Sequence, residues 1–184
     1  MPLTLLIGGA RSGKSALAQR MGEAWGGPVL VVATTRPDEP GMADRIRRHR
    51  ADRPPAWRTV EEPVDLAGAL RAGPADALVL VDCLTVWTSN LLAAGRTPAE
   101  VEAEATRTAD VAAGREAPTV AVTNEVGMGV HPVTELGRAY RDVLGQVNVA
   151  WAAASSEALL VVAGQALPLL RPEAVLASLR EGAA

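Results

Sequence analysis

The 184-residue chain is 48% hydrophobic and 21% charged, a balance typical of a globular protein and not of a disordered one. Its formal net charge of −3 argues against a general nucleic-acid binder, because such proteins are usually strongly basic. The single cysteine, Cys83, excludes an intrachain disulfide and favours a reducing compartment.

Short apolar runs along the chain predict the strands of a sheet, at 3–7, 28–35, 77–85, 118–126 and 158–164. Each run is continuous, as is typical of strands buried on both faces of a parallel sheet. Helical patterns lie between or after the runs, at 14–25, 97–115, 133–155 and 171–182. This alternation predicts an α/β fold with a doubly wound, mostly parallel sheet, in one domain spanning residues 1–184.

Residues 36–62 interrupt this pattern with prolines, arginines and a histidine. We expect an irregular insertion there that carries function. The N-terminal apolar run is too short for a signal peptide, and no 18-residue apolar span occurs in the sequence. We therefore expect a cytoplasmic protein that does not insert into a membrane.

The segment Gly8-Gly9-Ala10-Arg11-Ser12-Gly13-Lys14-Ser15 fits the pattern G-x-x-x-x-G-K-[ST] between a predicted strand and a predicted helix. Backbone N–H groups of such a loop, together with the helix N-terminus, bind phosphate oxygens. Lys14 is the only lysine among 18 Lys and Arg residues. Its compact charge fits between phosphates where the broad fork of arginine does not. Ser15 supplies a hydroxyl to Mg²⁺ in this interpretation, so the segment predicts a nucleoside triphosphate site.

Within the run 77–85, Asp82 ends the segment ALVLVD (77–82), at the edge where open α/β sheets bind ligands. We predict that Asp82 is the carboxylate on the magnesium side of the site. The alternative is that Asp82 only caps a helix that starts near Thr85.

His49 lies in an arginine-rich stretch, with arginines at positions 45, 47, 48, 50 and 53. A solvated helix face is the ordinary explanation of such a cluster. In the functional interpretation, the arginines neutralise polyphosphate and keep His49 uncharged near pH 7. A neutral imidazole can attack phosphorus and form a covalent phosphoramidate. His131 precedes a proline at an expected helix entry, and we predict a structural or peripheral role for it.

Several segments, taken in chain order, resemble the bifunctional adenosylcobinamide kinase / adenosylcobinamide-phosphate guanylyltransferase family of cobalamin biosynthesis. The matching segments are GGARSGKS (8–15), VATT (32–35), MADRIRRHRADRPPAWRTVEEP (42–63), LVDCLTVWTSNLL (80–92), VTNEVGMGVHP (122–132) and GRAYRDVLGQVN running into LLVVAG (137–164). The phosphate-loop motif is shared by very many proteins. The patterns H-x-x-x-R-P-x-x-W-x-T-x-E and NEVGMG are much more specific.

In that family a histidine of the insertion carries GMP covalently, and the matching residue is His49. The family's guanine-nucleotide contacts fall here on Gly8, Gly9, Ala10, Arg11, Ser12, Gly13, Lys14, Ser15, Ala33, Thr34, Thr35, Arg50, Ala51, Asp52, Arg53, Glu61 and Asp82. This chain has Arg48-His49 where relatives often have two histidines, and Thr35 where Ser is expected. Asp82 replaces the Glu of some relatives, which shortens its reach.

The resemblance implies two reactions, with Mg²⁺ as cofactor. The terminal phosphoryl group of GTP or ATP passes to adenosylcobinamide, with Lys14 at the phosphates, and GMP then passes from GTP through His49 to adenosylcobinamide phosphate. A homo-oligomer is also expected, with helix 133–155 as a candidate contact. A plain small-molecule kinase and a nucleotide-dependent switch are the alternatives. Guanine-binding switches usually carry N-K-x-D, and TNEV (123–126) lacks both the Lys and the Asp.

Overall fold

The computed structural model describes residues 3–36 and 53–181. Its strands form one sheet in the order β3-β2-β4-β5-β1-β6-β7. Neighbouring strands are parallel except for β6 and β7, which form an antiparallel hairpin. The bounds are β1 (Leu3–Gly8), β2 (Val29–Ala33), β3 (Arg58–Glu61), β4 (Leu78–Asp82), β5 (Thr119–Asn124), β6 (Glu157–Val162) and β7 (Gln165–Pro168). The prediction of an α/β fold with a mostly parallel sheet is confirmed.

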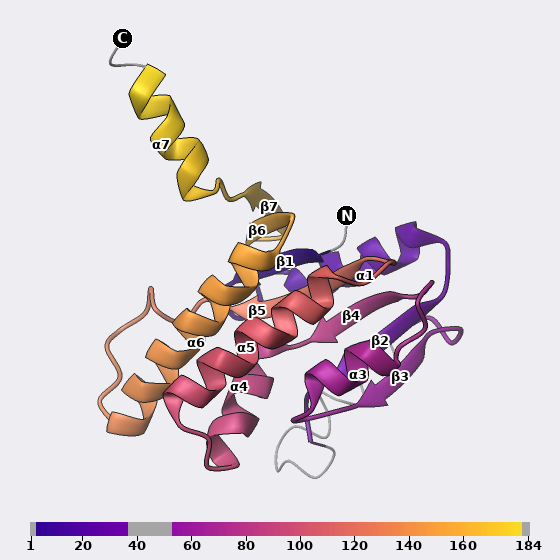
Figure 1. The fold of residues 1–184 in the computed structure, drawn as a ribbon, viewed down its shortest axis with the longest axis horizontal. Coiled ribbons are helices and arrows are strands. Elements are labelled where there is room, and N and C mark those ends of the chain that lie inside the picture. The colour runs from indigo at the N-terminus through magenta and orange to yellow at the C-terminus, as the bar shows by residue number, and fades with distance from the viewer. Residues whose placement is uncertain (1–2, 37–52, 182–184) are drawn as a thin grey trace.

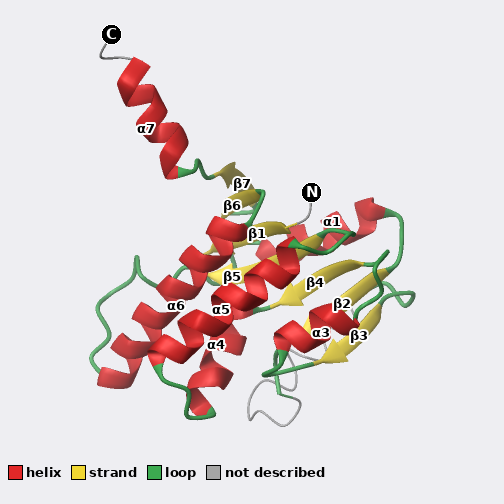
Figure 2. Ribbon diagram, in the orientation of Figure 1, coloured by secondary structure: helices red, strands yellow, loops and turns green. Residues whose placement is uncertain are grey.

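All described helices except the last pack on the two faces of this sheet (Figures 1 and 2). Their bounds are α1 (Lys14–Trp25), α3 (Leu66–Ala72), α4 (Leu84–Ala93), α5 (Pro98–Ala113), α6 (Glu135–Ala154) and α7 (Pro172–Glu181). Helices α3, α4, α5 and α6 cover one face, where Trp87 and Trp151 are fully buried against the strands. Helix α1 covers the opposite face through a smaller core that includes Ala18 and Leu80. Helix α7 projects away from the sheet (Figure 1).

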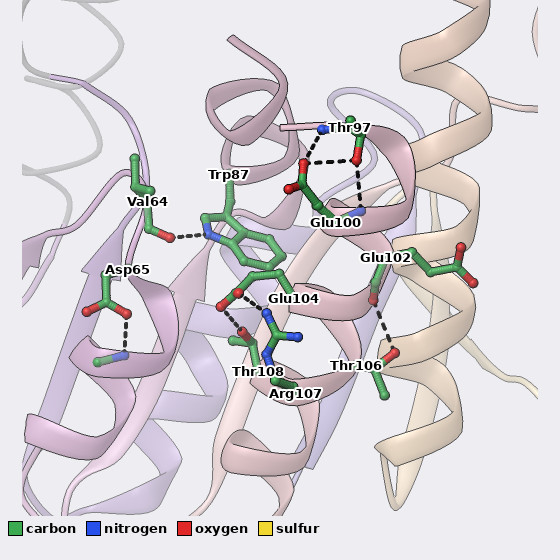
Figure 3. A network of polar contacts seen from close by, with 11 residues as sticks. Val64, Asp65, Trp87, Thr97, Glu100, Glu102, Glu104, Thr106, Arg107 and Thr108 are labelled. Carbon is green, nitrogen blue, oxygen red and sulfur yellow. Dashed lines mark hydrogen bonds and ion pairs between the residues drawn. The ribbon is translucent and has the colours of Figure 1, made fainter. Parts of the chain in front are cut away.

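Local signals explain where the longer helices begin. At the start of α5, the Thr97 hydroxyl accepts a hydrogen bond from the Glu100 N–H, and the Glu100 carboxylate accepts one from the Thr97 N–H (Figure 3). This capping box satisfies N–H groups that have no partner inside the helix. Helix α6 begins in a similar way, because the side chain of Thr134 accepts from the Gly137 N–H. No described helix is long and apolar enough to cross a membrane.

The structure differs from the predicted elements at the sheet edges and after β4. Strand β3 lies within the region expected to be irregular, and strand β7 was not predicted. Both are edge strands with mostly exposed residues, so neither has the continuous apolar run of a buried strand. The run 77–85 is a strand only to Asp82, because α4 begins at Leu84. Helix α3 has seven residues, too few to show a clear helical period.

Candidate active site

The predicted phosphate loop connects β1 directly to α1. Gly8 ends the strand, and Gly13 occupies the N-cap position of the helix with a φ of 104°, a conformation that side chains disfavour. At Gly8 a Cβ atom would lie 2.3 Å from the Val161 carbonyl oxygen, so only glycine fits this close approach. The loop also contacts the β6–β7 turn, because the Gly164 N–H donates to the Ser12 carbonyl at 2.8 Å. The loop conformation therefore depends on β6, on the β6–β7 turn and on the glycines of the loop itself.

Lys14 is the most buried charged group of this loop. Its side chain turns back across the loop, and the ammonium donates to the carbonyls of Gly8 at 2.9 Å and Gly9 at 2.7 Å. The Ser12 hydroxyl is a third, longer contact at 3.4 Å. Only 5% of the residue is exposed. The lysine charge thus lies at the centre of the loop, where phosphate oxygens are expected.

A cavity of about 250 Å³ lies between α1 and the sheet, beside the loop. Its lining includes both residues predicted for the magnesium side, Ser15 and Asp82, together with Gln19, Arg53 and Trp57. Arg53 Nη2 lies 3.2 Å from Asp82 Oδ2, and both side chains are mostly buried. This pairing joins the end of the insertion to the carboxyl end of β4.

The alternative role of Asp82 as a helix cap is not what the structure shows. The N-cap residue of α4 is Cys83, and no side-chain hydrogen bond caps this helix. Asp82 instead ends β4 and lines the cavity.

The other predicted contacts meet at the same edge of the sheet. Ala33, at the end of β2, pairs in register with Glu61 of β3 on one side and with Asp82 of β4 on the other. Thr34 follows and is fully buried; its hydroxyl donates to the Cys83 carbonyl at 2.7 Å. The predicted residues at the ends of β2, β3 and β4 are therefore neighbours in the sheet. His49, Arg50, Ala51 and Asp52 lie outside the described residues.

A further cluster of hydrogen-bonded residues lies at the end of β5. No role was assigned to any of its residues from the sequence. The Thr85 hydroxyl accepts from the Asn124 N–H at 2.8 Å, and the Thr85 carbonyl accepts from the Tyr140 hydroxyl at 3.0 Å. Burial, with a smaller contribution from Cys83, raises the pKa of Tyr140 to about 12, so the phenol stays protonated at neutral pH and keeps this hydrogen bond. The only sequence signal for this cluster was the NEVGMG segment. His131, predicted to be peripheral, is exposed on the loop that follows.

Comparisons with known proteins show the family of this chain. A family model described as cobinamide kinase / cobinamide phosphate guanyltransferase matches residues 4–169. The chain is 40% identical over 166 residues to the bifunctional adenosylcobalamin biosynthesis protein CobP of Pseudomonas aeruginosa, covering 90% of this chain and 95% of that protein.

Two enterobacterial proteins are similarly related. The chain is 39% identical to the bifunctional adenosylcobalamin biosynthesis protein CobU of Escherichia coli and 40% identical to that of Salmonella typhimurium. Each match covers 88% of this chain and 96% of the relative. With its phosphate loop, its acidic strand end and this similarity over most of its length, the chain belongs to the cobinamide kinase / cobinamide phosphate guanyltransferase family.

Proposed function

We propose that this transferase phosphorylates adenosylcobinamide and then transfers GMP to the product. The observation that carries the proposal is that Ser15, the last residue of the phosphate loop, and Asp82 line one cavity, in a chain of this family. Phosphoryl transfer requires mainly positioning and neutralisation of charge, and a phosphate loop with a lysine supplies both.

In the first reaction the acceptor hydroxyl oxygen of adenosylcobinamide bonds to the γ-phosphorus of GTP or ATP. The bond between that phosphorus and the β–γ bridging oxygen breaks, the nucleoside diphosphate leaves, and the hydroxyl proton passes to solvent. The Lys14 ammonium and the loop N–H groups hold the phosphate oxygens during this step. The product is adenosylcobinamide phosphate.

The residues on the magnesium side fit Mg²⁺. Ser15 and Asp82 line the same cavity, and a hydroxyl with a carboxylate is the hard-oxygen donor set that this ion prefers. Few protein ligands are needed, because Mg²⁺ is usually held by one or two protein groups, phosphate oxygens and water. When bound, Mg²⁺ neutralises charge on the phosphates.

In the second reaction we propose that a ring nitrogen of His49 attacks the α-phosphorus of GTP. The bond to the α–β bridging oxygen breaks and pyrophosphate leaves, so that GMP is linked to the histidine. A phosphate oxygen of adenosylcobinamide phosphate then displaces the imidazole, giving adenosylcobinamide-GDP. The position of Arg53 supports this role: it lines the cavity, and His49 precedes it by four positions in the chain, which span at most about 14 Å.

The same proposal includes the nucleotide contacts of Ala33, Thr34, Thr35, Glu61 and Arg53 at the carboxyl edge of the sheet. It also includes Arg50, Ala51 and Asp52, which adjoin His49 in the chain. We further propose that the protein forms a homo-oligomer, because large apolar side chains are exposed to solvent on α6 and β7. Val149 of α6 is 65% exposed, and Leu167 of β7 is 61% exposed.

The covalent step is tested with GTP labelled at the α-phosphate. Wild-type protein with Mg²⁺ is expected to carry label in an acid-labile, base-stable bond, and intact-mass spectrometry is expected to show one GMP adduct. His49→Ala should lose the label and guanylyl transfer while keeping much of the kinase reaction, because the γ-phosphate chemistry does not use this imidazole. The matched control is His131→Ala, which removes an exposed histidine and should label normally.

The outcomes also separate the alternatives. Equal labelling of His49→Ala removes His49 from its role. Phosphorylation of adenosylcobinamide without label in the wild type indicates a plain kinase. GTP hydrolysis that does not respond to the corrinoid indicates a switch.

A further inference from the structure

We propose that the side-chain amide of Asn124 donates a hydrogen bond to the terminal phosphate of the bound nucleoside triphosphate. This inference deepens the proposed function and rests on its nucleotide site, the phosphate loop at residues 8–15. It assigns a role to the first residue of the NEVGMG segment, which the site described above leaves without one.

The first observation is the face of the sheet on which Asn124 lies. Val122 packs in the core on the α1 side and lines the cavity beside Asp82, whereas Ala121 packs in the opposite core. Side chains alternate between the two faces along a strand. Asn124 is the last residue of β5 and lies two positions after Val122. Its amide is therefore on the cavity side of the sheet.

The second observation is the register of the central strands. Asn124 pairs with Gly8, the first residue of the phosphate loop, on β1. On the other side, β5 pairs with β4, and Asp82 is in register with Val122. Adjacent strands lie about 4.8 Å apart. Asn124 thus ends the strand that lies directly between the phosphate loop and the carboxylate on the magnesium side.

The third observation is how firmly the backbone of this residue is held. The Asn124 N–H donates to the Thr85 hydroxyl at 2.8 Å, and its carbonyl accepts from Asn148 Nδ2 at 3.0 Å. The next N–H, of Glu125, donates to the Gly8 carbonyl at 3.0 Å. The Gly8 carbonyl also accepts from the Lys14 ammonium. The amide is therefore attached to a rigid backbone that shares a hydrogen-bond acceptor with Lys14, which favours a precise contact.

The fourth observation concerns the amide itself. Within residues 3–36 and 53–181, the Asn124 side chain has no hydrogen-bond partner, although its residue is half-buried. Charge on a transferring phosphoryl group is spread over its equatorial oxygens. A neutral donor fixed beside those oxygens stabilises them without adding another charge next to Asp82. These properties fit the terminal phosphate, which lies farthest along the triphosphate from the nucleoside.

Binding of two nucleotides provides the direct test. We expect Asn124→Ala to weaken binding of the β,γ-imido analogue of GTP with Mg²⁺ about tenfold, because one hydrogen bond to a charged oxygen is lost. Binding of GDP with Mg²⁺ should stay within about twofold, because GDP lacks the terminal phosphate that the amide contacts. Asn124→Asp keeps the side-chain shape but places a carboxylate beside the phosphate. Its affinity for the analogue should therefore fall more than that of Asn124→Ala. This second variant also tests the contact if Asn124→Ala does not fold.

Kinetics provides the second readout. With adenosylcobinamide as acceptor, the rate of phosphoryl transfer should fall about 100-fold in Asn124→Ala, the effect of removing one fixed donor to a charged transition state. The matched control is Gln146→Ala, which removes an exposed side-chain amide on α6 and should behave as wild type in both assays.

Equal losses of affinity for GDP and for the triphosphate analogue would show that Asn124 has a purely structural role, and would overturn the proposal. Unchanged affinity for both nucleotides would overturn it as well. Wild-type protein that binds both nucleotides but does not phosphorylate adenosylcobinamide would refute the proposed function instead. The binding experiment would still decide the role of Asn124 in that case.

Discussion

At the scale of single residues, the surroundings of Lys14 explain why this position has the only lysine in the chain. Its ammonium donates to two carbonyl oxygens of its own loop, at 2.7 and 2.9 Å, in a nearly closed space. An ammonium can direct its donors to carbonyl and phosphate oxygens from one compact centre. A guanidinium is planar and wider, so it cannot occupy the same point.

Lys14→Arg is therefore expected to reduce both reactions about 100-fold although the charge is kept. The measurements are the rate of adenosylcobinamide phosphorylation and the rate of GMP labelling from α-labelled GTP. Arg20→Lys, the reverse exchange at an exposed position of α1, serves as the control and should leave both rates unchanged. Wild-type rates in Lys14→Arg would contradict the geometric explanation.

Residues of the site differ in how far the sequence alone could predict them. The phosphate loop is a local motif, so its place between β1 and α1 and the start of α1 at Lys14 were predicted correctly. Asp82 was recognisable as a strand end. The position of Asn124 next to Gly8 depends on the pairing of β5 with β1, a long-range register that no local pattern contains. His49 lies outside the described residues, and its role stays a prediction.

At the scale of elements, α5 shows how a short signal sets a helix end. The pKa of Glu100 is held below its usual value of 4.5, chiefly by hydrogen bonds that its carboxylate accepts from the backbone N–H and hydroxyl of Thr97. The ionised form is thus favoured in the folded state. Its contribution to stability is complete above pH 4.5 and is lost as the pH falls through the lowered pKa.

Thr97→Ala removes the hydroxyl that caps α5 and should lower the free energy of unfolding by about 1 kcal/mol at pH 7. Urea unfolding followed by circular dichroism measures the change. Thr106→Ala is the control on the same helix, since that hydroxyl only bonds the carbonyl of Glu102 in the helix interior and should cost little (Figure 3). The difference in the free energy of unfolding between wild type and Glu100→Gln should also become smaller below pH 4.5. A difference that is constant with pH would contradict this role of Glu100.

The elements that were not predicted share a physical cause. Central strands are buried on both faces and therefore read as apolar runs, as for β2 and β4. Strands β3 and β7 lie at the two edges of the sheet, and their exposed residues are compatible with a loop. Their assignment requires the neighbouring strand, which the local sequence does not reveal.

At the scale of the whole molecule, the larger core contains two fully buried tryptophans with different polar surroundings. The Trp87 indole N–H donates to the Val64 carbonyl at 2.8 Å, which ties α4 to the segment before α3 (Figure 3). The Trp151 indole N–H is buried and has no acceptor among the described residues. The two side chains thus contribute similar apolar burial but unequal hydrogen bonding.

Replacement of each tryptophan by phenylalanine tests this difference. Both changes remove a similar volume, but Trp87→Phe also removes one hydrogen bond to the Val64 carbonyl, which then keeps the Leu66 N–H at 3.0 Å. We expect Trp87→Phe to reduce the free energy of unfolding by about 1–2 kcal/mol more than Trp151→Phe does. Urea titrations of the two variants give the comparison, and an equal or larger loss for Trp151→Phe would refute it.

The placement of β1 has a consequence for the growing polypeptide. β1 and the phosphate loop are synthesised before the other described elements, yet β1 pairs with β5 and β6, and the loop is held by the Gly164 N–H from the turn after β6. A nascent chain that stops before Thr119 contains the complete phosphate-binding motif but neither of the strands that flank it. Because such long-range pairing must wait for its partners, the ability to hold a nucleotide arises only late in translation.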